Sequence, residues 1–231
     1  MSIQGRLTGI RERIAAAARS AGRDPSSVRL VAVSKTFPID AVRDAFAAGQ
    51  RDFGENRVQE ALQKIDASAD LDIRWHLLGH LQTNKARKAA PAFAMVQSVD
   101  SLELLDKLDR AAADAGARPE LLVQVDLARE ATKFGAPPAD ARRILDAAAR
   151  CTAARVTGLM TLPPVPDIPE DARPWFRQLR ELRDRWRAEG VPAPMLAELS
   201  MGMSADFEIA VQEGATIVRV GTAIFGSRHA D

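Results

Sequence analysis

The chain has 231 residues and a mass of 25.0 kDa, enough to bury the core of one barrel domain. Its 32 Lys and Arg residues against 31 Asp and Glu leave a formal charge of +1, which gives no reason to expect a nucleic-acid partner. No stretch approaches the roughly 18 apolar residues of a membrane span, and the start MSIQGRLTGIRERI lacks the apolar core of a secretory signal, so we expect a cytoplasmic protein with no membrane partner.

The first predicted element is an amphipathic helix that carries Leu7, Ile10 and Ile14 on one face. Behind it, short β-branched runs alternate with longer helical segments. Strands are predicted over 30–34, 51–54, 74–78, 94–98, 121–126, 155–160, 195–199 and 216–220. Helices are predicted over 39–48, 57–65, 101–115, 139–150, 175–189 and 205–213.

The strand pattern favours a closed barrel. Runs such as RLVAV and LLVQV are apolar without alternation, which is typical of strands covered on both faces. Eight βα units with no composition break predict one α/β domain over 1–231, a (β/α)8 TIM-type barrel with an extra N-terminal helix. An open doubly wound sheet stays as the alternative.

Two other segments have simple expected roles. The Pro-rich stretch 161–174 is predicted to be a surface loop, either a plain connection or a lid on the binding side. The single cysteine, Cys151, excludes an internal disulfide and a cysteine-based metal cage, and we expect it to be a buried structural thiol rather than a reactive one.

The run LVAVSK places Lys35 just past the first predicted strand, at the rim where barrels build their sites. Partial desolvation there favours the neutral amine, which is a nucleophile toward an aldehyde. Position alone leaves a solvated lysine as an equal alternative.

The other end of the chain offers a phosphate site. LSMGMS follows the seventh predicted strand and TIVRVGTAIFG contains the eighth, and barrels often bind phosphate with the loops after these two strands. Gly221 allows close backbone approach, Thr222 offers an N–H and a hydroxyl, and Ser200 offers another hydroxyl. Ser204 is predicted instead to cap the helix that starts at residue 205, with Asp206 complementing its positive end.

Arg219 lies on the last strand and alternates with Val218 and Val220, so its side chain is expected to point away from theirs. An arginine inside a barrel needs a partner. An ion pair with a buried carboxylate such as Glu198 and a ligand-binding role are equally compatible with its position.

These residues lie within a set of motifs that occur in a fixed order: AVSK (32–35), FGENRVQE (53–60), WHLLGHLQTNK (75–85), GLMTL (158–162), LSMGMSADFEIAVQEGAT (199–216) and VRVGTAIFGSR (218–228). Over nearly its whole length the sequence therefore resembles the pyridoxal 5′-phosphate (PLP) homeostasis proteins, single-domain relatives of the amino-terminal barrel of alanine racemase. The resemblance implies a barrel of PLP fold type III without the racemases' C-terminal domain, and PLP as the cofactor.

Carried over position by position, the resemblance implies that Lys35 forms the Schiff base with PLP. It implies that Ser200, Gly221 and Thr222, with backbone near Met201, hold the phosphate.

The same resemblance implies that Arg219 faces the pyridine nitrogen and that Asn56 and His76 lie around the ring. Because an arginine only donates, a pyridine nitrogen opposite Arg219 must accept and stay neutral, which makes PLP a poorer electron sink. Many family members carry an aromatic residue where this chain has Arg57, so contacts at that rim position stay open.

Composition limits catalysis. The racemases of this fold use a tyrosine from a second domain as one of two acid/base groups, and this chain has no tyrosine. His76 could act as a single base, but a histidine within WHLLGHL is more often a hydrogen-bonded wall residue. His76, His80 and His229 show no metal-binding spacing, so no metal is expected.

The first hypothesis is thus a non-catalytic PLP-binding protein that buffers or delivers the cofactor. The alternatives are a weak PLP-dependent amino-acid racemase, a Schiff-base aldolase acting on a sugar phosphate, or a barrel with an interaction role only. The basic segment 85–88, KARK, is interpreted as a solvated face that could contact an acidic PLP-requiring apoenzyme. We expect a monomer.

Overall fold

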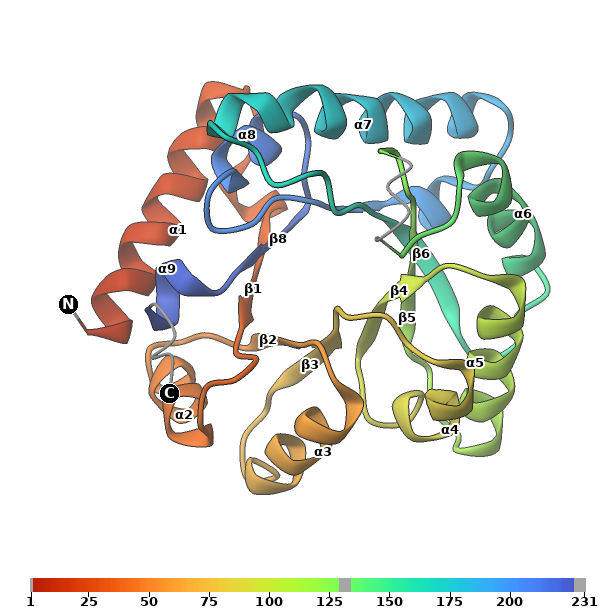
Figure 1. Ribbon diagram of the computed structural model, residues 1–231, viewed down its shortest axis with the longest axis horizontal. Coiled ribbons are helices and arrows are strands. Elements are labelled where there is room, and N and C mark those ends of the chain that lie inside the picture. The colour runs from red at the N-terminus through yellow and green to blue at the C-terminus, as the bar shows by residue number, and fades with distance from the viewer. Residues whose placement is uncertain (1, 129–133, 227–231) are drawn as a thin grey trace.

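The computed structural model describes residues 2–128 and 134–226. Eight parallel strands form a closed barrel in chain order, β1 to β8, with the helices around it (Figure 1). The predicted fold class is therefore confirmed. Since β1 pairs with β8 as well as with β2, the ring is closed and the alternative of an open doubly wound sheet is wrong.

The strands are β1 (Arg29–Val33), β2 (Asp52–Glu55), β3 (Arg74–Leu77), β4 (Met95–Val99), β5 (Glu120–Gln124), β6 (Arg155–Met160), β7 (Glu198–Ser200) and β8 (Ile217–Val220). The α-helices are α1 (Ile3–Ser20), α2 (Ile39–Ala47), α3 (Val58–Ala67), α4 (Ala86–Ala89), α5 (Leu102–Asp114), α6 (Pro138–Ala148), α7 (Arg173–Ala188), α8 (Phe207–Gln212) and α9 (Thr222–Phe225). Short 3-10 helices are η1 (Pro25–Ser27), η2 (Thr83–Lys85), η3 (Pro169–Ala172) and η4 (Ala193–Leu196).

Seven strand predictions agree with the structure to within two residues, and β7 is the exception. The predicted run 195–199 begins in η4, whose prolines at 192 and 194 favour a tight turn and remove backbone donors that a strand would use. The strand proper is only the three residues Glu198–Ser200. The short helices α4 and α9 were not predicted, because four residues are too few to show helical periodicity.

The core has two layers. Most buried apolar side chains lie between the strands and the surrounding helices, while Val31, Met95, Leu122, Met160 and Ile217 form a separate buried cluster. These five come from strands around the ring, so they fill the barrel interior, as side-chain layers do in such barrels. The barrel is thus a packed core, with room for a site only at its ends.

The opening helix α1 buries the predicted face with Leu7, Ile10 and Ile14. Its N-cap is Ser2, whose hydroxyl accepts the Gly5 N–H at 3.2 Å, and the helix packs beside α8 and α9 (Figure 1). Helix α1 therefore braces the end of the chain that carries β8. Among the helices of the described ranges, none has the length and apolarity needed to cross a membrane.

Cys151 lies just after α6 and is half-buried rather than fully buried. Burial, helped by the carboxylates of Asp109 and Asp106, raises the pKa of its thiol to about 11. We expect fewer than about one thiol in a hundred to be ionised at pH 8, and slow reaction with a disulfide reagent such as DTNB. Rates measured in buffer and in urea test this, and equal rates would contradict it.

Candidate functional site

A cavity of about 370 Å³ opens at the carboxyl ends of the strands. It is lined by Val33, Lys35, Asn56, Leu78, Leu162, Met203, Ser204, Arg219, Gly221 and Thr222. Five predicted site residues are among them: Lys35, Asn56, Arg219, Gly221 and Thr222. They come from the ends of β1, β2 and β8, which closure of the barrel makes neighbours.

Lys35 lies in a tight turn directly after β1. The Phe37 N–H donates to the Ser34 carbonyl oxygen at 3.0 Å and closes this turn. Thr36, between them, has φ 70°, a left-handed conformation that costs a β-branched residue free energy. The turn places a half-buried lysine at the wall of the cavity.

Ser204 has a different position from the one expected. Helix α8 begins only at Phe207, and the Ser204 hydroxyl instead accepts the backbone N–H groups of Gly221 at 3.2 Å and Ala223 at 3.4 Å. The prediction that Ser204 caps the helix after residue 205 is therefore wrong. Its hydroxyl lies at the start of α9, where the loops after β7 and β8 meet.

Two glycines shape these loops. Gly202 has φ 92°, and a Cβ there would lie 2.5 Å from the Ala210 Cβ, so only glycine lets the chain turn this closely against α8. A Cβ on Gly221 would approach Val33 to 3.2 Å at its carbonyl oxygen and 3.4 Å at its Cβ. Since Val33 also lines the cavity, the bare backbone of Gly221 keeps a cradle open between β8 and β1.

Arg219 reaches the cavity from inside the barrel. It is 4% exposed, and its guanidinium donates to the Ser200 hydroxyl at 2.5 Å and to the Thr161 carbonyl oxygen at 2.9 Å. Burial lowers its pKa to about 10, although the Asp206 carboxylate opposes the shift, so it stays charged at neutral pH. A guanidinium has five N–H donors, so these two bonds fix it without using all of them.

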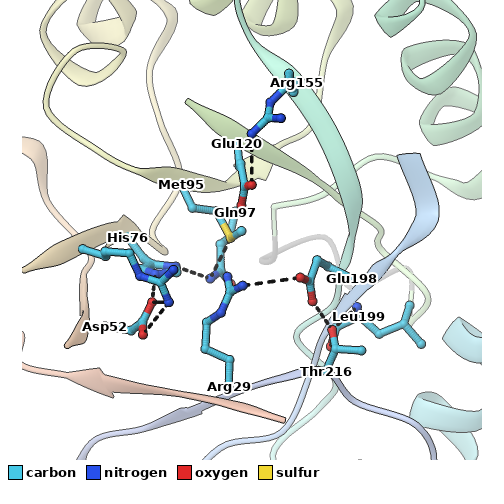
Figure 2. Close-up of polar contacts among 11 residues, drawn as sticks. Arg29, Asp52, His76, Met95, Gln97, Glu120, Arg155, Glu198, Leu199 and Thr216 are labelled. Atoms are coloured by element: carbon cyan, nitrogen blue, oxygen red, sulfur yellow. Dashed lines mark hydrogen bonds and ion pairs between the residues drawn. The ribbon is translucent and has the colours of Figure 1, made fainter. Parts of the chain in front are cut away.

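Of the two interpretations of Arg219, the ion pair with Glu198 is wrong. Glu198 lies near the other end of the barrel, where it pairs with Arg29 at 3.6 Å and accepts a hydrogen bond from Thr216 (Figure 2). The other interpretation of Arg219, a role in ligand binding, fits its place in the cavity lining.

Ser200 and Met201 are fully buried and do not line the cavity. The Ser200 hydroxyl donates to the Gln97 side-chain oxygen at 2.6 Å and accepts from Arg219, and the Met201 N–H donates to the Ile217 carbonyl. Both groups are used inside the barrel. The structure thus separates these two residues from the cavity where they were expected to hold a phosphate, and brings Ser204 to it.

His76 also lies away from the cavity, and Leu78, two residues later on the same face, lines it instead. The His76 Nε2 contacts an Asp52 carboxylate oxygen at 3.0 Å, and its Nδ1 faces the Gln97 amide nitrogen at 3.1 Å (Figure 2). Arg74 holds the same carboxylate. The interpretation of His76 as a hydrogen-bonded wall residue agrees with this placement, and a place around a ligand ring does not.

Together these bonds form a polar chain through the barrel interior. Arg219 donates to Ser200, Ser200 to Gln97, Gln97 to His76 and His76 to Asp52. Burial lowers the pKa of His76 despite the opposing effect of Asp52, so the imidazole is neutral, with its one proton on Nε2. Every donor therefore points in one direction, away from the cavity.

No cluster of three or more His, Cys, Asp or Glu side chains suited to a metal occurs in residues 2–128 and 134–226. His229 lies outside these ranges. Of the residues that sequence reasoning missed as site residues, Ser204 has the clearest signal, because it lies in the loop after β7, whereas Ser200 lies within that strand.

The basic segment and the Pro-rich stretch each approach the cavity with one residue. Arg87 and Lys88 are exposed, in agreement with a solvated face, and Lys85 borders a shallow hollow with Asn56 and Arg57. In the Pro-rich stretch, Leu162 lines the cavity, and the stretch ends in η3 and the first residues of α7 rather than in a loop to residue 174.

Comparison with known proteins gives a consistent result. The family model described as alanine racemase, N-terminal domain, matches residues 6–229. A pyridoxal phosphate homeostasis protein from Aquifex aeolicus is 42% identical over 223 residues, which cover 96% of this chain and 97% of the relative. One from Pseudomonas aeruginosa is 43% identical over 228 residues, with 98% and 96% covered.

Solved structures agree in fold. PipY of Synechococcus elongatus, determined with PLP bound, is 43% identical and superimposes with a TM-score of 0.87 over 97% of this chain and 100% of that one. Alanine racemase of Clostridium difficile is 15% identical, with a TM-score of 0.75 over the whole of this chain and 58% of the enzyme. The latter likeness shows the barrel fold alone.

Proposed function

We propose, on the premise that this chain belongs to the alanine racemase N-terminal domain family and within it to the pyridoxal phosphate homeostasis proteins, that it binds PLP at the carboxyl end of its barrel. Its role is to buffer or deliver this cofactor inside the cell. The observation that carries the proposal is that Lys35 and the Ser204–Gly221–Thr222 loops line one cavity.

The residues present fit the cofactor. Bound PLP supplies an aldehyde that reacts reversibly with an amine and a phosphate that needs N–H and hydroxyl groups. Lys35 would provide the amine, while Gly221, Thr222 and Ser204, which line the same cavity, would hold the phosphate. The Ser204 hydroxyl already accepts two N–H groups there, as a phosphate oxygen would, and the cradle beside Gly221 exists because no Cβ fills it.

Arg219 and Asn56 complete the proposed site. Arg219 would face the pyridine nitrogen of bound PLP, and Asn56 would lie beside its ring. Three predicted residues lie deeper in the barrel and do not line the cavity: Ser200, Met201 and His76. Among them, Ser200 acts by holding the Arg219 guanidinium. Because Arg219 is charged and only donates, a pyridine nitrogen opposite it would accept a hydrogen bond and carry no proton.

The same geometry limits turnover. A pyridine without a proton is a weak electron sink, and the chain has no tyrosine to serve as the second acid/base group of a racemase. The His76 imidazole is neutral, but both its nitrogens are engaged by Asp52 and Gln97, away from the cavity. We therefore propose a carrier without robust catalysis.

Titration with PLP tests the proposal. We expect a visible absorption band to grow to one equivalent of PLP and to bleach with borohydride, leaving a reduced PLP adduct on the peptide that contains Lys35. A colourless protein that gains no adduct mass would contradict cofactor binding. Binding without loss of the α-proton of added amino acids supports a carrier, whereas steady α-proton exchange would show a racemase.

Two serines give a matched pair of variants. Ser204→Ala removes the hydroxyl at the phosphate position, and we expect PLP affinity to fall roughly tenfold with little change in stability. Ser200→Ala leaves the buried Arg219 without one acceptor, and we expect a loss of about 1–3 kcal/mol in the free energy of unfolding. PLP titration and urea unfolding of both variants check this, and the reverse order of effects would assign the phosphate to Ser200.

The remaining features of the proposal concern the cell. We propose a cytoplasmic monomer that contacts PLP-requiring apoenzymes transiently at the cavity rim. The exposed Arg57, Arg87 and Lys88 support an acidic contact surface on such a partner.

A further inference from the structure

A buried ion-pair network lies directly behind the Lys35 turn. The Lys64 ammonium, on α3, donates to the Ser34 carbonyl oxygen at 2.8 Å, to Glu55 at 2.7 Å and to Glu60 at 3.1 Å. An ammonium has three donors, so all of them are used. Lys64 is 7% exposed and Glu55 is completely buried. Both carboxylates belong to the motif FGENRVQE, which PLP binding as proposed above uses only through Asn56.

The network contacts the residues on both sides of Lys35. The Ser34 hydroxyl donates to the Glu55 carboxylate at 2.7 Å, and the Thr36 N–H donates to the Glu60 carboxylate at 2.7 Å. Ser34 is fully buried and its N–H is paired with the Gly54 carbonyl. The two backbone groups next to Lys35, the Ser34 carbonyl oxygen and the Thr36 N–H, are thus both hydrogen-bonded to charged side chains. Such hydrogen bonds are stronger than those between neutral partners.

The Thr36 conformation shows that this fixation opposes a local preference. At φ 70° a threonine is strained, and glycine is the usual residue at such a position. A strained residue persists only where its surroundings hold it. Here the Glu60 carboxylate holds its N–H. Burial raises the pKa of Glu60, but the Thr36 N–H and Lys64 outweigh it and lower the pKa overall, so the carboxylate is charged at neutral pH.

We propose that Glu60 and Lys64 are positioning residues that hold the strained turn and so direct the Lys35 side chain into the cavity for reaction with PLP. This inference rests on the proposed function of Lys35. Lys64 acts from the buried side on Ser34 and Glu55, and Glu60 acts from the solvent side on Thr36. Neither residue is among those that line the cavity.

The test uses Glu60, because it is 29% exposed at its side chain and its removal should leave the fold intact. Glu60→Ala removes the acceptor of the Thr36 N–H, whereas Glu60→Gln keeps an oxygen there. Glu103→Ala is the matched control: Glu103 also lies in the first turn of a helix and pairs with the lysine four residues later, Lys107, but on α5.

Two measurements on the full chain test this inference. In the protein without PLP, we expect hydrogen exchange of the Thr36 amide, measured by NMR, to be about tenfold faster in Glu60→Ala than in the wild type. The dissociation constant for PLP should rise about tenfold. Glu60→Gln should keep both values within about threefold of the wild type, and Glu103→Ala should change neither.

The possible outcomes distinguish a failure of this inference from a failure of the proposed PLP binding on which it rests. If Glu60→Ala lowers thermal stability but keeps wild-type Thr36 exchange and PLP affinity, the network has a structural role only and the inference is overturned, while PLP binding stands. If the wild type itself forms no reducible adduct on Lys35, the proposed function fails first, and this is seen without any variant.

Discussion

Replacing Lys35 with alanine is expected to abolish the visible absorption band and the borohydride-stable adduct with PLP. The residual affinity would come only from Arg219 and the phosphate loops, by which we mean the loops after β7 and β8 that carry Ser204, Gly221 and Thr222. It should be at least about a hundredfold weaker, because a covalent bond is lost while the other contacts remain. The measurement is a spectroscopic titration beside mass spectrometry of the reduced complex. The free energy of unfolding should change little, since Lys35 is only half-buried.

The control for this variant is Lys85→Ala. Lys85 borders the neighbouring hollow with Asn56 and Arg57, so it samples the same basic rim without lining the cavity. It should keep the absorption band and the adduct. A Lys35→Ala protein that still forms a full equivalent of adduct would place the reacting amine on another lysine, and peptide mapping would identify it.

The second large effect concerns stability. Lys64→Met removes the ammonium that pairs with Glu55, whose second carboxylate oxygen has no hydrogen-bond partner among the described residues. Leaving one member of a buried ion pair unpaired typically costs about 3–5 kcal/mol, and we expect a loss of this size in urea unfolding at pH 7. Lys107→Met removes the lysine of an exposed pair on α5 and should cost within about 0.5 kcal/mol.

The deficit of Lys64→Met should depend on pH. Burial raises the pKa of Glu55 above its usual 4.5, although Lys64 and Ser34 oppose the rise, and without Lys64 the rise is larger. A carboxyl group with a raised pKa destabilises the folded state only at pH values at which the group is ionised. The difference between variant and wild type in the free energy of unfolding should therefore be greatest at pH 7 and become smaller as the pH falls toward 4.5. A gap that is constant over this range would show a packing defect instead.

The fold could be predicted from the sequence because each strand is a short buried run between helices of clear periodicity. The β7 region failed for a local reason, since a proline-flanked 3-10 helix took the first part of the apolar run. Pairing of β1 with β8 joins the two ends of the sequence, and no local pattern reports it. The closure of the ring could be inferred only from the number of βα units and from the absence of a composition break between them.

The site was predicted best among residues that directly follow strands, with the exception of Met201, which follows β7 but is buried and does not line the cavity. Lys35, Asn56, Gly221 and Thr222 all come one or two residues after a strand and all line the cavity. His76, which lies within β3, is one layer deeper in the barrel, as Ser200 is within β7. Alternation tells which face of a strand a side chain takes but not how far along the barrel axis it lies.

Within the chain, the phosphate loops and Lys35 come from opposite ends of the sequence and meet only through the β1–β8 pairing. Ribosomes make β1 first and β8 last, so a growing chain contains Lys35 long before it contains Gly221 and Thr222. A nascent chain can therefore assemble the complete cavity only after its last strand has left the exit tunnel. We therefore expect cofactor capture to report that the ring has closed, and we expect chains truncated before β8 to leave the cofactor free for chains that contain it.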